Sequence, residues 1–116
     1  MTFVAKSPED YEGQVVGDGN CVAYVRQASG APETAKWSEG AKVKGSNITV
    51  GTAIATFVGG VYPNASSGNH TAIYMGQDAN GLEVWDQWKG QAVHRRVIRF
   101  KGSGGSNDGD AFSVIE

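Results

Sequence analysis

The stretch that decides the fold is Gly17-Asp18-Gly19-Asn20-Cys21-Val22-Ala23-Tyr24-Val25-Arg26, which contains the only cysteine of the 116-residue chain. Apolar residues follow Cys21 at the i+3, i+4 and i+7 positions of a single helical face. Two polar residues of the kind that cap helix starts precede the cysteine, and Gly30 is a typical residue for a helix end. The pattern predicts a short helix from Cys21 to about Ser29, with the cysteine in its first turn.

A cysteine in the first helical turn can be a nucleophile. The first turn has unpaired backbone N–H groups and the positive end of the helix dipole, and both favour a thiolate over a thiol. The alternative is that Cys21 is a small, buried and inert apolar residue, as many free cysteines are. Other residues are needed to decide between the two interpretations.

Composition predicts one globular domain over residues 1–116, since 40% of the residues are hydrophobic and 19% are charged. The formal net charge of −2 gives no electrostatic argument for a nucleic acid or an anionic membrane as a partner. A single cysteine forms no intrachain disulfide. Residues 1–6 are too short and polar for a signal peptide, and no apolar run is long enough to span a membrane. We therefore expect synthesis in the cytoplasm, with any export depending on other machinery.

The chain after the helix indicates a strand-rich region, and its 17 glycines are consistent with many turns. A helical turn is expected near residues 8–12, and an irregular connection over residues 31–50, held to the core by Trp37 and Val43. Loops are expected at residues 59–69 and, as a flexible segment, at 101–110. Apolar and β-branched runs predict strands at residues 52–58, 70–76, 82–88, 92–100 and 111–115. The result is an α+β fold in which an N-terminal helix packs on an antiparallel sheet of about five strands.

A nucleophilic cysteine needs a general base, and the chain offers two histidines. His70 opens a strand directly after a loop, so its imidazole is expected at the sheet edge, where the start of a helix lying on the sheet could meet it. His94 is followed by two arginines, which disfavour an imidazolium and are typical of a solvated surface. We therefore predict His70 as the base, although a histidine at this position, taken alone, is more often a strand-end residue that caps a backbone carbonyl.

The residue that orients His70 can be predicted from strand register. A five-residue loop at 77–81 would place Ala72 opposite Asp86, so that Asp86 shares a sheet face with His70 at a diagonal position. A two-residue Asn80-Gly81 turn would instead bring Gln87 to that face, but too far along the strand. Asp86 is therefore the predicted orienting carboxylate and Gln87 the second candidate. A carboxylate there would fix the imidazole tautomer and stabilise the imidazolium.

The oxyanion that forms during acyl transfer needs donors near the cysteine. The backbone N–H of Cys21 is one, and a second could come from Asn20, Asp18 or Gln14; the sequence leaves the choice open. Three aromatic residues are candidates for a substrate groove, although most aromatic residues of a small domain are core: Tyr62, Trp85 and Trp88. No metal site is predicted, because no pair of potential ligands has the short spacing of structural sites.

Two motifs together resemble the papain-like cysteine amidases and peptidases of the NlpC and CHAP type. Gly19-Asn20-Cys21 matches the turn that opens their catalytic helix, and His70-Thr71-Ala72-Ile73-Tyr74-Met75-Gly76 matches their histidine strand. The third polar residue of that family lies on the next strand, which here contains Asp86. The resemblance covers about residues 17–100. The family usually has His, Asn or Gln as this third residue, and its Gly-Asp-(Leu/Ile) strand opening is replaced here by Gly51-Thr52-Ala53.

The resemblance implies a papain-like fold, no cofactor, and hydrolysis of amide bonds in peptidoglycan stem peptides or cross-links by a cysteine hydrolase. The small size and the absence of a signal peptide are similar to the amidase effectors of type VI secretion. Such effectors are antibacterial toxins that reach a target-cell periplasm, and a periplasmic immunity protein protects the producing cells. Two other functions stay open: a papain-like deamidase or acyltransferase acting on proteins, and a non-catalytic binding module with an inert Cys21. The bond cleaved, the immunity protein, the oligomeric state and the export route do not follow from the sequence.

Overall fold

The architecture is one α-helix on a six-stranded antiparallel sheet, in a computed structural model that describes residues 1–102 and 104–116. The helix α1 spans Cys21–Ser29, and the order of the strands in the sheet is β1-β6-β2-β3-β4-β5. The strands are β1 Glu39–Lys42, β2 Ala53–Thr56, β3 Thr71–Gln77, β4 Gly81–Trp88, β5 Gln91–Arg99 and β6 Phe112–Ile115. Short 3-10 helices lie at Pro8–Tyr11, Thr34–Lys36, Gly105–Asn107 and Gly109–Ala111. The predicted α+β class is therefore confirmed.

Helix α1 begins and ends where its capping residues predict. The Asn20 side chain accepts a hydrogen bond of 3.0 Å from the Val22 N–H, which satisfies one of the unpaired donors at the helix start. Gly30 adopts the left-handed conformation (φ 78°) and donates its N–H to the Arg26 carbonyl at 2.9 Å. Cys21 is consequently the first residue of the helix.

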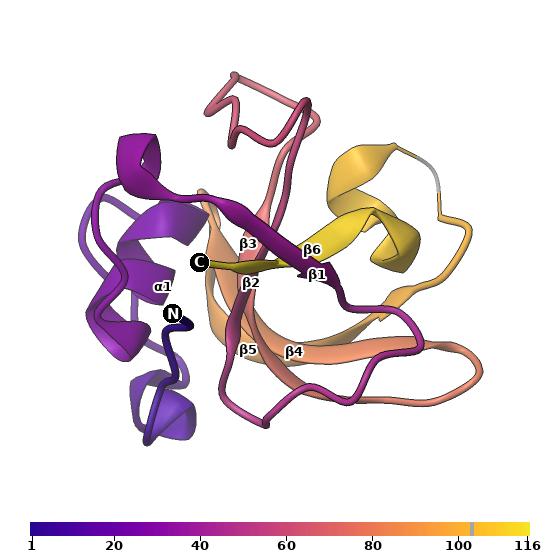
Figure 1. Cartoon of the computed structure of the whole chain (residues 1–116). Coiled ribbons are helices and arrows are strands. Elements are labelled where there is room, and N and C mark those ends of the chain that lie inside the picture. Colours follow the sequence, from indigo (N-terminus) through magenta and orange to yellow (C-terminus); the bar gives the residue numbers. More distant parts are fainter. Residues whose placement is uncertain (103) are drawn as a thin grey trace.

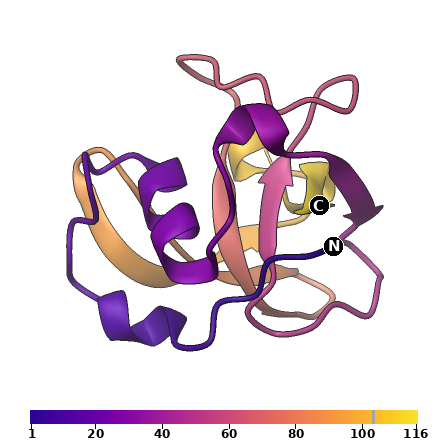
Figure 2. The ribbon, with the colours of Figure 1, turned by 60° about the vertical axis from the view of Figure 1, so that its left-hand side comes forward.

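The sheet has two apolar faces, because successive strand residues point to opposite sides. One face packs against α1, which lies over β3 and β4 (Figure 1), and includes Tyr24, Val25, Ala53, Ala55, Ile73, Trp85 and Ile115. The other face is covered by loop residues such as Ile48 and Phe100, and includes Val43, Ile54, Tyr74, Leu82, Val84, Ile98 and Phe112. In Figure 1 and Figure 2 the two chain ends lie close together, and the Met1 amino group is 3.8 Å from Glu116 Oε1.

The prediction of about five strands is wrong by one strand. The additional strand, β1, lies in the segment 31–50 that was expected to be irregular, and it pairs with β6 at the sheet edge. Its sequence Glu-Gly-Ala-Lys has no apolar alternation, since the strand is largely exposed and is held by backbone pairing. Trp37 and Val43 are buried on either side of β1, as expected for the anchors of this segment.

The predicted register between β3 and β4 is confirmed at the histidine end, but the loop that was expected to produce it is not. Ile73 pairs with Trp85 and Tyr74 with Val84, which places Ala72 opposite Asp86. The strands extend further than expected, so the connection comprises only residues 78–80, and an extra residue at Met75 restores the register.

A second irregularity lies between β4 and β5. Asp86 pairs with His94 and Trp88 with Gln91, so two residues of β5, Ala92 and Val93, lie opposite one residue of β4. The backbone of Val93 bonds instead to the N-terminal segment, accepting from Gly13 at 2.9 Å and donating to Gln14 at 2.9 Å. This bulge determines which β5 side chains share a face with Asp86.

The segment 101–110, expected to be a flexible loop, contains two short 3-10 helices before β6, and residue 103 of that loop lies outside the described residues. Among residues 1–102 and 104–116, no helix has the length and apolarity that crossing a bilayer requires.

Candidate active site

The loop before Cys21 is a tight turn that only glycine can form at two positions. Gly17 and Gly19 have φ values of 58° and 88°, and a Cβ on Gly17 would approach the Ala23 Cβ to 2.9 Å. The Asp18 carboxylate accepts a hydrogen bond of 2.9 Å from the Asn20 N–H. Asp18 therefore shapes the turn, and Asn20 caps the helix that starts at Cys21.

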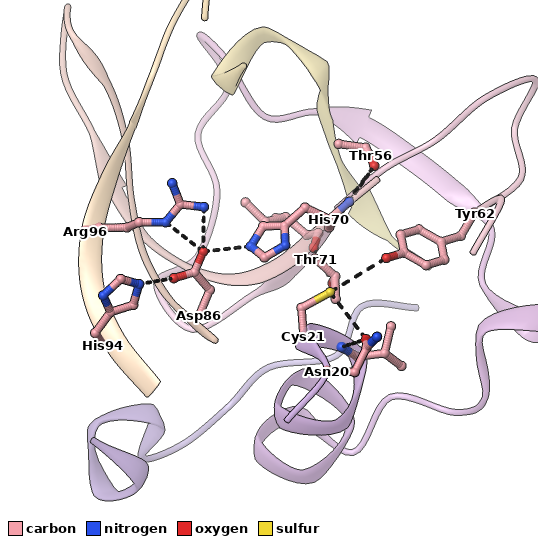
Figure 3. A network of polar contacts seen from close by, with 11 residues as sticks. Asn20, Cys21, Thr56, Tyr62, His70, Thr71, Asp86, His94 and Arg96 are labelled. Atoms are coloured by element: carbon pink, nitrogen blue, oxygen red, sulfur yellow. Dashed lines mark hydrogen bonds and ion pairs between the residues drawn. The ribbon is translucent and has the colours of Figure 1, made fainter. Parts of the chain in front are cut away.

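The sulfur of Cys21 lies in a small polar pocket at the helix start (Figure 3). Its side chain is buried, with 8% of the residue surface exposed. Sγ donates to Asn20 Oδ1 at 3.6 Å and lies 3.9 Å from the Tyr62 hydroxyl. The Tyr62 hydroxyl in turn accepts from the Asn69 side chain at 3.5 Å. The thiol is therefore surrounded by hydrogen-bonding groups, which an inert apolar cysteine would not need.

His70 is held at both its backbone and its ring. Its backbone N–H donates to Thr56 Oγ1 and its carbonyl accepts from the Thr56 N–H, both at 3.0 Å. Its ring nitrogen Nε2 lies 2.7 Å from Asp86 Oδ2. The second ring nitrogen is then free for the thiol, and Figure 3 shows the imidazole between Asp86 and Cys21.

The charges of the three groups support an ion pair between the cysteine and the histidine. Burial alone would raise the pKa of the Cys21 thiol, but the hydrogen bond and the positive charge of His70 outweigh it and lower this pKa. Burial opposes the imidazolium of His70, yet its contacts with Asp86 and Cys21 raise the pKa of His70 to about 9. Burial also opposes a charged Asp86, but hydrogen bonds from His70 and Arg96 hold its pKa below the usual value.

Asp86 is fully buried and carries contacts that the sequence did not predict. Arg96 approaches Oδ2 with Nε at 2.9 Å and Nη2 at 2.8 Å. His94 Nε2 lies 3.1 Å from Oδ1, without hydrogen-bond geometry. The expectation of a solvated His94 is therefore wrong: the side chain is 29% exposed and lies against the carboxylate. The bulge in β5 brings His94 and Arg96 to the face of Asp86.

Gln87 is also fully buried but points to the other side of β4. Its carboxamide accepts from the Val16 N–H at 2.9 Å and donates to the carbonyls of Val16 at 2.9 Å and Asn20 at 2.8 Å. These bonds fix the loop that leads into Cys21. Of the two candidates for the third residue, Asp86 is the one that contacts His70, and the burial of Gln87 leaves no surface for a substrate.

Comparison with known proteins reveals a close relationship. The family model described as domesticated amidase effector 2 matches residues 1–115. This chain belongs to that family. It is 39% identical to the type VI secretion amidase effector 2 protein of Salmonella typhi, over 97% of this chain and 95% of the relative. It is 36% identical to the domesticated amidase effector 2 of Ixodes scapularis, over 94% of this chain and 81% of the relative.

A solved structure supports the same relationship. The type 6 secretion amidase effector 2 (Tae2) structure superposes with a TM-score of 0.88 at 37% identity, over 98% of this chain and 94% of that chain. Membership of the family confirms the sequence expectation of an amidase effector. The broader resemblance to NlpC and CHAP enzymes stays a prediction.

The three aromatic residues predicted to line a substrate groove differ in how far they are buried. Trp85 is buried among the core residues that pack on α1, and Tyr62 is buried beside the sulfur, against Trp37. Trp88 is 39% exposed, and its ring lies 6.3 Å from that of His70 and 4.9 Å from that of His94. Only Trp88 therefore offers an open aromatic surface beside the histidine.

Sequence reasoning missed three residues that hold the site: Thr56, His94 and Arg96. Thr56 carried no sequence signal beyond its place in a strand. A tight Lys89-Gly90 turn alone would pair Asp86 with Val93 and direct His94 to the opposite face. The contact between His94 and Asp86 could therefore be predicted only with knowledge of the bulge in β5. Among the described residues, no three His, Cys, Asp or Glu side chains gather in an arrangement that could hold a metal ion.

Proposed function

We propose that the protein is a cysteine amidase that hydrolyses amide bonds in the stem peptides or cross-links of peptidoglycan, with Cys21, His70 and Asp86 as its catalytic residues. The observation that carries the proposal is the buried chain of contacts from Asp86 through His70 to Cys21 at a helix start. The family to which the chain belongs supports the amidase reaction. A papain-like mechanism is part of the proposal.

In this mechanism the ion pair is present before substrate arrives. The Cys21 thiolate attacks the amide carbonyl, and the backbone N–H of Cys21, at the start of α1, stabilises the resulting oxyanion. The Tyr62 hydroxyl lies beside the sulfur and is the candidate for a second donor, whereas Asn20 presents its acceptor Oδ1 to the sulfur. The His70 imidazolium then transfers its proton to the leaving amine, and Asp86 keeps the ring oriented. Water, activated by the neutral imidazole, releases the acyl group from the sulfur.

The test is digestion of purified Gram-negative sacculi by the wild type and by Cys21→Ala, with product masses read by mass spectrometry. We expect the wild type to release muropeptides and Cys21→Ala to release none. The masses identify the bond that is cleaved. Because the substitution removes one buried sulfur, the melting temperature of both proteins must be measured to show that the variant is folded. Equal digestion by a folded Cys21→Ala would contradict the proposal.

We also propose that the protein acts as an antibacterial effector in the periplasm of a target cell, and that an immunity protein blocks it there. The relatives named as type VI secretion effectors support this proposal. Expression in a Gram-negative host with an added periplasmic signal should cause lysis, whereas cytoplasmic expression should not. Lysis by the periplasmic Cys21→Ala variant would show that toxicity does not come from the amidase reaction.

A further inference from the structure

A cavity of about 400 Å³ opens beside His70, on the side of Trp88 and Arg96. Loop residues close it opposite these three side chains: Asn69, Ser106 and Asn107. Cys21 and Tyr62 do not line it, so it is separate from the pocket that holds the sulfur. His70 belongs to both spaces. A substrate bound at the sulfur would therefore reach this cavity by passing the imidazole.

The described residues that line the cavity carry no carboxylate, and one of them is an arginine. The two Arg96 bonds to Asp86 use Nε and Nη2 and leave Nη1 uncommitted to that carboxylate. The side chain of Arg96 is 21% exposed. On the opposite wall, amide and hydroxyl groups provide neutral donors. An anionic group in this cavity would meet donors on two sides and no like charge among the lining residues, since the nearby Asp86 carboxylate is buried and paired with Arg96 and His70.

The orientation of the guanidinium is fixed before any ligand arrives. Asp86 binds one edge of the Arg96 guanidinium, and the central carbon Cζ of this guanidinium lies 4.9 Å from the centre of the Trp88 ring. A planar guanidinium held in this way presents its remaining N–H groups with little loss of side-chain entropy on binding. The planar anion that matches such a fork is a carboxylate.

The position of the cavity also determines which part of a substrate can enter it. In the proposed mechanism His70 gives its proton to the leaving amine, so the fragment that carries this amine lies on the side of the imidazole. The acyl fragment lies instead on the sulfur. A cavity lined by His70 but not by Cys21 therefore faces the amine fragment.

We propose that this cavity, lined by Trp88, Arg96 and Asn107, binds a free carboxylate on the fragment that leaves as the amine. The inference rests on the proposed amidase function and specifies its substrate: an amide whose amine-side residue carries a free carboxylate near the bond that is cleaved. Arg96 thereby links recognition to the chemistry, because the same side chain contacts Asp86.

The test compares muropeptide dimers in their natural form with the same dimers after their carboxyl groups are converted to carboxamides. The wild type should have a KM about tenfold lower for the natural form, the effect of one charge-assisted hydrogen bond. Asn107→Asp places a negative charge in the cavity without touching Asp86 and should abolish this preference. Asn80→Asp makes the same change in the β3–β4 connection, at the other end of β3 from His70, and should keep the preference.

A wild type that cleaves both forms with equal KM would overturn the subsite and leave the amidase proposal intact. A preference for the natural dimers that persists in Asn107→Asp would also overturn the subsite. Cleavage of neither form would instead contradict the amidase proposal. Calorimetry with Cys21→Ala then decides the subsite without any reaction: a Kd about tenfold lower for the natural dimers supports it, and equal Kd values overturn it.

Discussion

Asp86 and Gln87 are neighbours in β4, are both fully buried, and hold opposite halves of the candidate site. Asp86 contacts the His70 ring, whereas Gln87 bonds the backbone of the loop that leads into Cys21. One strand can do both because consecutive side chains point to opposite faces of the sheet. The difference shows that the site has two parts on adjacent residues of β4. Asp86 belongs to an electrostatic part, which controls the charge of His70, and Gln87 to a positional part, which holds the loop before Cys21.

The two halves should respond differently to substitution. Asp86 is a charge that sets the protonation of His70, so its loss should change rate and pH dependence. Gln87 is neutral and bonds only backbone groups, so its loss should change stability and the placement of Cys21. The following predictions test this separation, from the largest expected effect to the smallest.

The largest effect is expected from His70→Ala, compared with His94→Ala as a matched control. Both histidines contact Asp86, but only His70 also reaches the thiol. His70→Ala should lower kcat/KM on muropeptides about 1,000-fold through loss of the general acid and base, and His94→Ala less than about tenfold. Equal losses in the two variants would contradict the assignment of His70.

Asp86→Asn should lower kcat about 100-fold, because the amide neither stabilises the imidazolium nor fixes its tautomer by charge. The pKa of His70 should also fall below about 9, which a pH titration by NMR can measure. Glu83→Gln is the control, since it removes another acid of β4 that pairs with Arg95 at 3.1 Å. An unchanged His70 pKa in Asp86→Asn would show that the carboxylate does not control this histidine.

Gln87→Leu should destabilise the fold by about 2–4 kcal/mol, because the partly buried backbone groups of Val16 and Asn20 lose three hydrogen bonds to its carboxamide. Chemical denaturation measures this effect, and the rate of Cys21 alkylation should fall as well. Gln77→Leu is a matched control, because Gln77 bonds the backbone of Val43, Gly45 and Ser46. It should destabilise the fold but leave the alkylation rate unchanged. Unchanged alkylation in Gln87→Leu would refute the positional role.

Cys21 should be alkylated rapidly already at neutral pH, because the imidazolium of His70 stabilises the thiolate there. The alkylation rate should fall as the pH is lowered, with a midpoint below the ordinary thiol pKa. The ion pair should be lost as the pH rises through about 9, the pKa of His70. The stability from the raised pKa of His70 is complete below the unfolded value of about 6.5 and is lost towards pH 9. The lowered pKa of Cys21 adds stability as the pH rises towards the ordinary thiol value, so the two contributions oppose each other and stability should change little from pH 6.5 to 9. Asp86, with a lowered pKa, contributes above about pH 4 and is lost as the pH falls. Urea unfolding from pH 3 to 10 measures these contributions; stability that stays constant as the pH falls from 6 to 3 would contradict the charged state of Asp86.

The smallest effect is expected at the helix cap. Asn20→Ala should cost about 1 kcal/mol, because the Val22 N–H loses its acceptor. Asn20→Asp keeps the cap but places a negative charge beside Sγ, so it should slow alkylation at neutral pH while preserving stability. Faster alkylation in Asn20→Asp would contradict the proximity of this side chain to the thiolate.

The sequence was sufficient for the parts of the site that depend on local patterns. The start of α1 at Cys21 followed from capping residues and helical spacing, and Asp86 followed from one register argument. That argument reached the right pairing through a loop of the wrong length, because a bulge at Met75 compensated for it. A bulge leaves no pattern in side-chain polarity, so the agreement could not have been known in advance.

The rest of the site depends on contacts between distant segments. Thr56 holds the His70 backbone from another strand, and β1 exists through pairing with β6 rather than through its own composition. Arg96 and His94 reach Asp86 because a bulge at Ala92 and Val93 absorbs the extra residue of β5. Such features follow from tertiary packing, which overrides local preference.

The bulge in β5 connects the β4–β5 hairpin to the N-terminal segment. Deleting Ala92 would restore a regular ladder with Gln87 opposite Val93, and Asp86 would stay opposite His94, so Arg96 would keep its contact with Asp86. The backbone of Val93 would then pair with β4 and lose its hydrogen bonds to Gly13 and Gln14. In engineering this scaffold, shortening β5 at the bulge is therefore expected to release the N-terminal segment while the contacts of Asp86 persist.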